Sequence, residues 1–224
     1  MKQLDLKVTQ EGNDSDWLGY LEVPVRETLQ TQGYFRVVLE TTPYLIRAET
    51  HERHYVVKVE INSGPKYRLD EIHFSGGTVF AEAELRAQFS LHHGELFNAS
   101  EIRDGLESMT TLYSRKGLID MTPEPVINID EKNLLIDVVV KIQEGKQYRV
   151  KTVEIHGLDP QAEQALKSQV EPGQVFDEIA LRKLIKKHMA GLRTDILNDV
   201  IQVRRDVPND SVDLLVDFRP CPKT

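Results

Sequence analysis

Cysteine is almost absent from this sequence, which has one, Cys221, in 224 residues. A single cysteine cannot form an internal disulfide or supply the several thiolates of a cysteine-built zinc site. No apolar run approaches the roughly 18–20 residues that a membrane-spanning helix requires. Met1 is followed directly by polar residues, so we expect no secretory signal at this end of the sequence. These absences exclude internal disulfides, a cysteine-built zinc site and a helical membrane span.

Basic residues are fewer than acidic residues in this sequence. The 28 Lys and Arg residues face 36 Asp and Glu residues, for a formal net charge of −8. This balance argues against nonspecific binding of nucleic acid. With 13 glycines and 10 prolines, the chain is neither collagen-like nor a low-complexity linker, and at 40% hydrophobic residues it is too apolar to be disordered. Its length predicts one or two domains unless the chain contains repeats.

The most informative feature is an internal repeat. Residues 61–76 align without a gap with residues 142–157, and both segments share a glycine, a Tyr-Arg pair, two aliphatic positions and a closing glycine. A second block matches residues 94–97 with residues 173–176, and a third matches Gly33-Tyr34 with Gly117-Leu118. The period near 80 residues exceeds the roughly 20–50 of most solenoid repeats, so each unit is long enough to have its own core. We therefore predict three tandem units, at residues 1–65, 66–146 and 147–224.

The second unit shows the order strand, helix, helix, strand, strand. Alternation over residues 67–74 predicts a strand, and helix formers over 81–89 predict a short helix. A second helix is predicted by one apolar stripe, formed by Ile102, Leu106, Met109 and Tyr113. Residues 126–129 and 134–142 flank a polar turn and predict a β-hairpin. The third unit repeats this order, with Asp159-Pro160 as the start of its first helix.

The first unit is too short for the same template. We predict a first strand at residues 4–8, a stunted first helix at residues 17–21 and a second helix that starts at Pro24. An excision that removes part of this unit accounts for its length nearly as well.

The order and recurrence of these elements resemble the POTRA (polypeptide-transport-associated) domain. The residues that carry the resemblance are Gly33-Tyr34, Gly117-Leu118, the segment Ile142-Gln143-Glu144-Gly145-Lys146-Gln147-Tyr148, and Gly157. The third unit departs from the pattern, because it lacks the Gly-Tyr step and does not end in Glu-Gly. The resemblance implies an α+β fold of three tandem β-α-α-β-β modules. Each would be a three-stranded mixed sheet packed against two helices, the first shortened or truncated.

The resemblance also implies a function without catalysis. Such modules form the periplasmic arm of outer-membrane β-barrel proteins of the BamA/TamA or two-partner-secretion type. The implied partners are unfolded or extended polypeptides, the protein's own C-terminal β-barrel, envelope lipoproteins and an anionic membrane surface, with no nucleic acid and no cofactor. We expect the chain to be an excised soluble fragment, with the barrel absent after Thr224. An envelope or cell-division scaffold that uses the same module is an alternative, and an unrecognised hydrolase is a weaker one from a different class.

The sequence offers no convincing catalytic or metal site. In His51-Glu52-Arg53-His54 the histidines are three apart, whereas two ligands on one helix face need a spacing of four, and the segment fits a hairpin turn better. The adjacent pair His92-His93 fits a solvated loop, and His188 lies on an apolar helix stripe. No Gly-x-Ser-x-Gly motif or phosphate-binding glycine loop is present. We therefore predict no catalytic, cofactor-binding or metal-ligating residues.

Client polypeptides are expected to bind at sheet edges. In the family the second strand of each module lies at an edge, which points to residues 36–40, 121–129 and 200–207. The middle segment contains Pro123 and Pro125, which cannot donate hydrogen bonds and protect an edge. The candidate residues are therefore Val200, Ile201, Gln202, Val203, Arg204 and Arg205, together with Arg36, Val37 and Val38. The alternative is that these are ordinary edges kept soluble by their charges.

Two further groups of residues complete the predictions. A basic patch on one helix of the third unit would face an anionic membrane, or else is simply a solvated helix face; it consists of Arg182, Lys183, Lys186, Lys187 and Arg193. The inter-module hinges are predicted at Gly64, Pro65 and Gly145. Neither linker contains a flexible Gly/Ser run, so we expect a semi-rigid, elongated arm.

Overall fold

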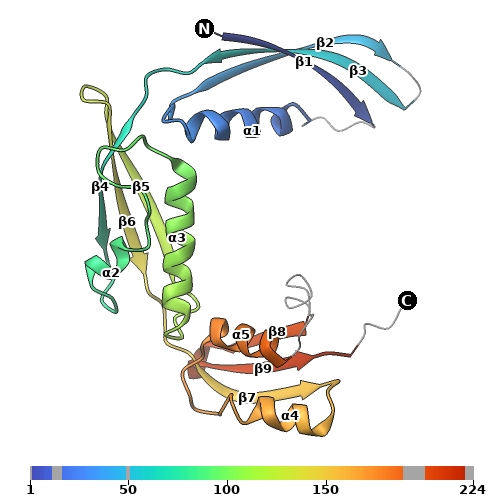
Figure 1. Cartoon of the computed structure of the whole chain (residues 1–224), viewed down its shortest axis with the longest axis vertical. Coiled ribbons are helices and arrows are strands. Elements are labelled where there is room, and N and C mark those ends of the chain that lie inside the picture. Colours follow the sequence, from blue (N-terminus) through green and yellow to red (C-terminus); the bar gives the residue numbers. More distant parts are fainter. Residues whose placement is uncertain (1, 12–16, 49–50, 189–199, 220–224) are drawn as a thin grey trace. The chain divides into compact units, whose positions relative to one another are not determined.

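The computed structural model describes residues 2–11, 17–48, 51–188 and 200–219. These residues form three three-stranded sheets, and each sheet carries its helices on one face (Figure 1). We call each sheet with its helices a module, numbered in chain order. The chain also divides into two compact units, one of residues 1–74, 81–106 and 125–140 and the other of residues 75–80, 107–124 and 141–224. The predicted α+β class of three tandem modules is confirmed.

The first module contains β1 (Lys2–Glu11), α1 (Trp17–Gln30), β2 (Val38–Ala48) and β3 (Glu52–Asn62). The sheet order is β1-β3-β2, and both pairings are antiparallel. Its core contains four buried residues, Val37, Leu39, Val57 and Val59. Apolar residues of α1 pack against this cluster, among them Trp17, Leu21, Val25 and Leu29.

Our prediction of two helices in the first module was wrong, because α1 continues through Pro24 as one helix. An interior proline removes one backbone hydrogen bond and typically costs about 3 kcal/mol. The carbonyl that loses its partner belongs to Tyr20, which is 72% exposed, so water can replace the missing N–H. The hydroxyl of Thr28 donates to the carbonyl of Pro24 at 2.7 Å and holds the next turn.

The number of helices also changes the polarity of the first sheet, which we expected to be mixed. One crossing helix returns the chain so that the second strand runs in the same direction as the first. The third strand follows by a hairpin and runs the opposite way, so β3 is antiparallel to β1. In the third module two helices intervene, and its first strand is accordingly parallel to its third. The sheet of the first module is therefore purely antiparallel.

The second module contains β4 (Arg68–Ser75), α2 (Glu82–Arg86), α3 (Ala99–Ser114), β5 (Thr122–Asp130) and β6 (Leu135–Gln143), with the sheet order β4-β6-β5. The predicted stripe of α3 is confirmed, since Ile102, Met109 and Tyr113 are buried. The side chain of Asn98 accepts a hydrogen bond from the backbone of Ser100 at 3.0 Å and caps the start of this helix.

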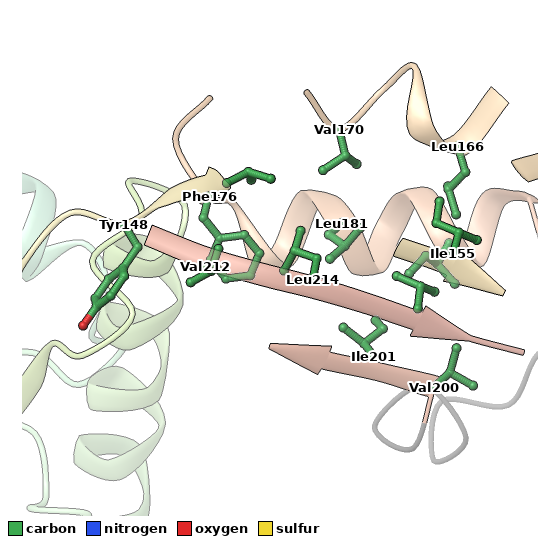
Figure 2. Close-up of a cluster of buried hydrophobic side chains, with 13 residues drawn as sticks. Tyr148, Ile155, Leu166, Val170, Phe176, Leu181, Val200, Ile201, Val212 and Leu214 are labelled. Carbon is green, nitrogen blue, oxygen red and sulfur yellow. The ribbon is translucent and has the colours of Figure 1, made fainter. Parts of the chain in front are cut away.

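The third module contains β7 (Arg149–His156), α4 (Pro160–Lys167), α5 (Glu178–His188), β8 (Ile201–Asp206) and β9 (Ser211–Asp217), with the order β7-β9-β8. A short 3-10 turn, Val207–Asn209, joins the last two strands. Figure 2 shows Leu166 of α4 and Leu181 of α5 directed toward the sheet, over Ile155 and Leu214. The helices and the sheet thus enclose one continuous apolar core.

Candidate polypeptide-binding edges and module junctions

The sheet order places the second strand of every module at an edge. The central strands are β3, β6 and β9, whereas β2, β5 and β8 each pair with one neighbour only within the described residues. The topology that we expected from the family pattern is therefore confirmed. An edge strand presents unpaired N–H and C=O groups to which an extended chain can hydrogen-bond.

The strand β8 carries most of the predicted client-binding residues. It pairs with β9 from Ile201 opposite Val216 to Asp206 opposite Ser211. Val200 and Ile201 are buried in the core and offer only their backbone, whereas Gln202 and Arg204 are exposed. Val203 packs at the margin of the core. Arg205 forms an ion pair with Asp120 of the second module, so its side chain takes part in the contact between the second and third modules.

The structure places the other predicted edge residues differently. Arg36 and Val37 precede β2, which begins at Val38 and extends to Ala48, well beyond residue 40. The side chain of Val37 is buried in the core of the first module. The distal half of β2 carries an exposed apolar run that the sequence analysis did not single out, Tyr44, Leu45 and Ile46, each more than half exposed. The sequence could have revealed this run. Side chains of a strand point alternately to its two faces, so at most two of three consecutive apolar residues can face the core.

The strand β5 contains both prolines that we expected to protect it, Pro123 and Pro125. Pro43 lies inside β2, and the pairing of β2 with β3 shifts register between Leu45 and Arg47. The strand β8 contains no proline. Among the three second strands, β8 therefore has the least interrupted backbone.

A shallow cavity of about 230 Å³ lies beside β8 on the face of the sheet that no helix covers. It is lined by Thr152, Glu154, Gln202, Arg204, Asp213, Leu214 and Leu215. The hydroxyl of Thr152 donates to the carboxylate of Asp213, and Glu154 lies 3.7 Å from His156. Arg204 forms no ion pair with any described residue. The cavity therefore offers one available cation beside acidic and apolar neighbours.

The junction between the first two modules is built around Tyr67, which precedes β4. Its backbone N–H donates to the carbonyl of Gly33 at 2.9 Å, and its carbonyl accepts from the N–H of Phe97 at 2.9 Å. The ring is 1% exposed, and its hydroxyl donates to Glu131 Oε2 at 2.6 Å. The other oxygen of Glu131 lies 2.7 Å from Arg36 Nη1. The hydrogen bond to Glu131, together with burial, raises the pKa of Tyr67.

The junction between the second and third modules repeats this framework around Tyr148. Its N–H donates to the carbonyl of Gly117 at 2.9 Å, and its carbonyl accepts from Phe176 at 3.0 Å. The ring is fully buried, and its hydroxyl donates to Asp120 Oδ2 at 2.6 Å. Arg205 Nη1 lies 2.5 Å from the other oxygen of Asp120. In Figure 2 the hydroxyl of Tyr148 points away from the core residues of the third module.

The tyrosines of both junctions were visible in the sequence as part of the repeat, but their role was not. Glu131 and Asp120 gave no signal, because they do not occupy corresponding positions in the repeat. The predicted hinge glycines flank these contacts, with φ of 64° at Gly64 and 69° at Gly145. A Cβ added at Gly145 would lie 3.2 Å from the Cβ of Asp120. The hinges themselves stay a prediction.

Glu144 closes the loop that follows β4. Its carboxylate accepts hydrogen bonds from the backbone N–H groups of Thr78 and Val79 at 2.7 and 2.9 Å, from the Thr78 hydroxyl at 2.7 Å and from the Tyr113 hydroxyl at 3.1 Å. Burial acts to raise the pKa of Glu144, but these hydrogen bonds outweigh it, and the pKa is lowered. Burial and the bond to Glu144 raise the pKa of Tyr113 to about 12.

The predicted basic patch lies on α5. Lys183, Lys186 and Lys187 are exposed, whereas Arg182 pairs with Glu178 at 2.7 Å. Arg193 lies outside the described residues, as does Cys221. None of the helices in the described part of the chain is both long and apolar enough to cross a membrane.

The histidines of the second module make local contacts. His93 Nδ1 lies 2.8 Å from the carbonyl oxygen of Asp70, and His92 Nδ1 lies 3.5 Å from the carboxylate of Glu95. In the first module, His54 lies in β3, 3.1 Å from the hydroxyl of Thr9. The described residues contain no cluster of side chains that could hold a metal ion.

Residues 67–145 match the POTRA family model, described as a surface antigen variable number repeat. The second module is similar to a POTRA domain over its whole length. Its matched range begins at the junction tyrosine Tyr67 and ends at Gly145, the predicted hinge residue, so the model covers the module from one junction to the next.

Solved structures extend the likeness to the other modules. POTRA domains 3–5 of BamA from Haemophilus influenzae match with a TM-score of 0.67 and 20% identity, over 93% of this chain and 83% of that chain. BamA from Haemophilus ducreyi lacking POTRA domains 1–3 matches with a TM-score of 0.49 and 18% identity, over 63% of this chain and 27% of that chain. The N-terminal domain of Omp85 from Thermosynechococcus elongatus gives a TM-score of 0.34 at 19% identity, over 83% and 76%. The first of these matches shows that the chain has the fold of tandem POTRA domains.

Proposed function

We propose that this chain is the periplasmic, polypeptide-binding arm of an outer-membrane β-barrel protein. It would act in outer-membrane protein assembly or polypeptide translocation, in a chaperone-like way and without catalysis. The match to the POTRA family model at residues 67–145 and the fold shared with BamA POTRA domains 3–5 support this proposal. The observation that carries it is the outer edge of β8, which pairs with no second strand among the described residues.

Strand addition at β8 explains how one surface can accept many clients. Main-chain hydrogen bonds supply the affinity, and they are available in any extended polypeptide. No residue from Ile201 to Asp206 is a proline, so every second residue of β8 keeps an N–H on the side away from β9. The buried side chains of Val200 and Ile201 fix the strand to the core while its outer backbone edge stays open.

The cavity beside β8 offers a mixed surface to the side chains of a bound client. A chain added next to β8 projects every second side chain onto the uncovered face of the sheet. There it would meet Gln202 and Arg204, with Leu215 and Asp213 behind them. This mixed surface accepts polar and apolar side chains alike, as a carrier of varied polypeptides requires.

An NMR titration of the full chain tests the proposal. An extended peptide taken from an outer-membrane protein strand is added to the labelled chain, and we expect the backbone amides of residues 200–207 to shift first. Backbone N–H groups of alternate β8 residues point to β9 and to the outer side; Arg204 lies opposite Asp213, whose backbone faces β8, so Val203 points outward. Val203→Pro removes this outward N–H and should weaken binding about tenfold. Val203→Ala shortens the same side chain but keeps the N–H, so it is the matched control and should bind nearly as well as the wild type.

Two outcomes would contradict strand addition at β8. Shifts that cluster on α4 and α5 would point to a groove between helix and sheet. Binding that is unchanged in Val203→Pro, with the remaining amide shifts of the third module preserved, would show that this edge is not used. Arg205→Pro, compared with Arg205→Ala, provides a second outward position should Val203→Pro perturb the module.

A further inference from the structure

The two junctions share one backbone framework but carry opposite charges at corresponding positions. Arg36 follows the junction glycine Gly33 by three residues, and Asp120 follows Gly117 by three residues. Both lie on the module that precedes the junction tyrosine. The preceding module therefore presents a cation at the first junction and an anion at the second.

The following module presents the complementary charge each time. Glu131, in the turn between β5 and β6, faces Arg36 at 2.7 Å. Arg205, in β8, faces Asp120 at 2.5 Å. These two partners do not occupy corresponding positions in the repeat, so each junction has an ion pair of its own.

At each junction the tyrosine hydroxyl donates a hydrogen bond to the acidic residue of the ion pair, whichever module that residue belongs to. Tyr67 donates to Glu131 of its own module, whereas Tyr148 donates to Asp120 of the preceding module, and both O–O distances are 2.6 Å. Because both rings are buried, each hydroxyl is held in place and orients one carboxylate oxygen. The second carboxylate oxygen is then directed at the arginine.

We propose that these charges specify which module follows which. If the first module docked onto the third, Arg36 would face Arg205. If a second module docked onto another copy of itself, Asp120 would face Glu131. Both wrong pairings bring like charges together, and only the order that the chain adopts satisfies both junctions.

Solvent exposure limits the strength of these pairs and defines their role. The arginine side chains are 57% and 52% exposed, and the acids 53% and 31%. Exposed ion pairs contribute little to overall stability. The buried tyrosines and the backbone bonds would therefore hold each junction together, while the charges discriminate between neighbours.

Charge reversal in the full chain tests the proposal. The double variants give each junction the order of charges that the other junction has. In Arg36→Glu two anions meet at the first junction, and Arg36→Glu/Glu131→Arg restores a pair with the polarity of the second. Asp120→Arg and Asp120→Arg/Arg205→Asp do the reverse at the second junction. Residual dipolar couplings report whether the two modules at a junction share one alignment tensor.

We expect each single reversal to lower the ratio of docked to undocked modules by on the order of fivefold, at its own junction only. Each matched double reversal should recover most of this loss. The neutral variant Arg36→Gln should give a docked-to-undocked ratio between those of the wild type and Arg36→Glu. Lys167→Glu reverses a charge in the ion pair with Glu163 on α4 and is the control that should change neither junction.

Single reversals that leave the alignment tensors unchanged would overturn the proposal. So would double reversals that stay undocked while amide shifts inside the modules match those of the wild type. Should a reversal unfold a module, the neutral pair Arg36→Gln and Glu131→Gln supplies a double-mutant cycle. Absence of coupling in that cycle would count equally against charge matching.

Discussion

The hydroxyl of Tyr113 donates a hydrogen bond to the carboxylate of Glu144 at 3.1 Å. The same carboxylate receives two backbone N–H groups from the loop after β4. One acidic side chain at the end of β6 thus ties the last turn of α3 to this loop. The first module has Ser63 at the position that corresponds to Glu144, so it has no carboxylate there to accept such hydrogen bonds.

Glu144→Gln should lower the free energy of unfolding by about 1–2 kcal/mol at neutral pH, because a charge-assisted acceptor is replaced by a neutral amide. The folded-state pKa of Glu144 is lowered, so its contribution is present above the unfolded pKa of about 4.3 and is lost as the pH falls through the folded value. Urea unfolding between pH 7 and 3 should therefore show a flatter acid limb in this variant. Glu107→Gln, on the exposed side of α3, should leave the profile unchanged.

The same contact predicts an alkaline effect. The pKa of Tyr113 is raised to about 12, so the stability that depends on its neutral hydroxyl is present below about pH 10 and is lost as the pH rises from 10 to 12. Tyr113→Phe should remove this part of the alkaline loss, which unfolding monitored by circular dichroism can measure. A full alkaline loss in Tyr113→Phe would contradict the assignment.

Gly117→Ala should destabilise the second junction by about 2–4 kcal/mol. The residue has φ of 74°, and an added Cβ would lie 2.7 Å from the carbonyl oxygen of Tyr148. Gly94→Ala is a matched control, because its φ is 80° but nothing lies within 4 Å of its added Cβ. The control should cost only the backbone strain of about 1 kcal/mol. Equal thermal destabilisation of the two variants would exclude a steric role for the close approach at Gly117.

The basic residues of α5 should bind an anionic membrane weakly and in a salt-sensitive way. Each exposed lysine near such a surface contributes about 1 kcal/mol, so the triple variant Lys183→Gln/Lys186→Gln/Lys187→Gln should lose binding on the order of 100-fold at low salt. Liposome sedimentation of the full chain measures this. Neutralising Arg115, Lys132 and Lys141 in the second module is the control. An equal loss of liposome binding in both variants, or no binding of the wild type at low salt, would contradict this prediction.

The linkers should permit only limited motion between modules. Gly145 and Gly64 are the predicted pivots, and Pro65 restricts the first linker further. We expect small-angle scattering to require a semi-rigid, elongated arm. Inserting a Gly-Ser-Gly-Ser segment after Gly145 should broaden the distribution of dimensions, whereas the same insertion in the β5–β6 turn, after Lys132, should not. A compact particle in the uninserted chain would contradict this prediction.

Much of the fold followed from local sequence patterns. The stripe of Ile102, Met109 and Tyr113 determines the buried face of α3, and Asp159-Pro160 determines the start of α4. The recurrence of Gly33 and Gly117 marked a repeated turn, because few residues other than glycine adopt the positive φ found there. These features depend on residues close together in the chain, so the sequence alone predicts them.

Only the tertiary structure decided the polarity of the first sheet and the chemistry of the junctions. The effect of Pro24 depended on whether its side of α1 faced solvent, which local propensity does not specify. Asp120 and Arg205 are 85 residues apart in the chain and meet because two modules fold and bring them to one buried tyrosine. Such long-range pairing is set by packing, and no local pattern in the sequence encodes it.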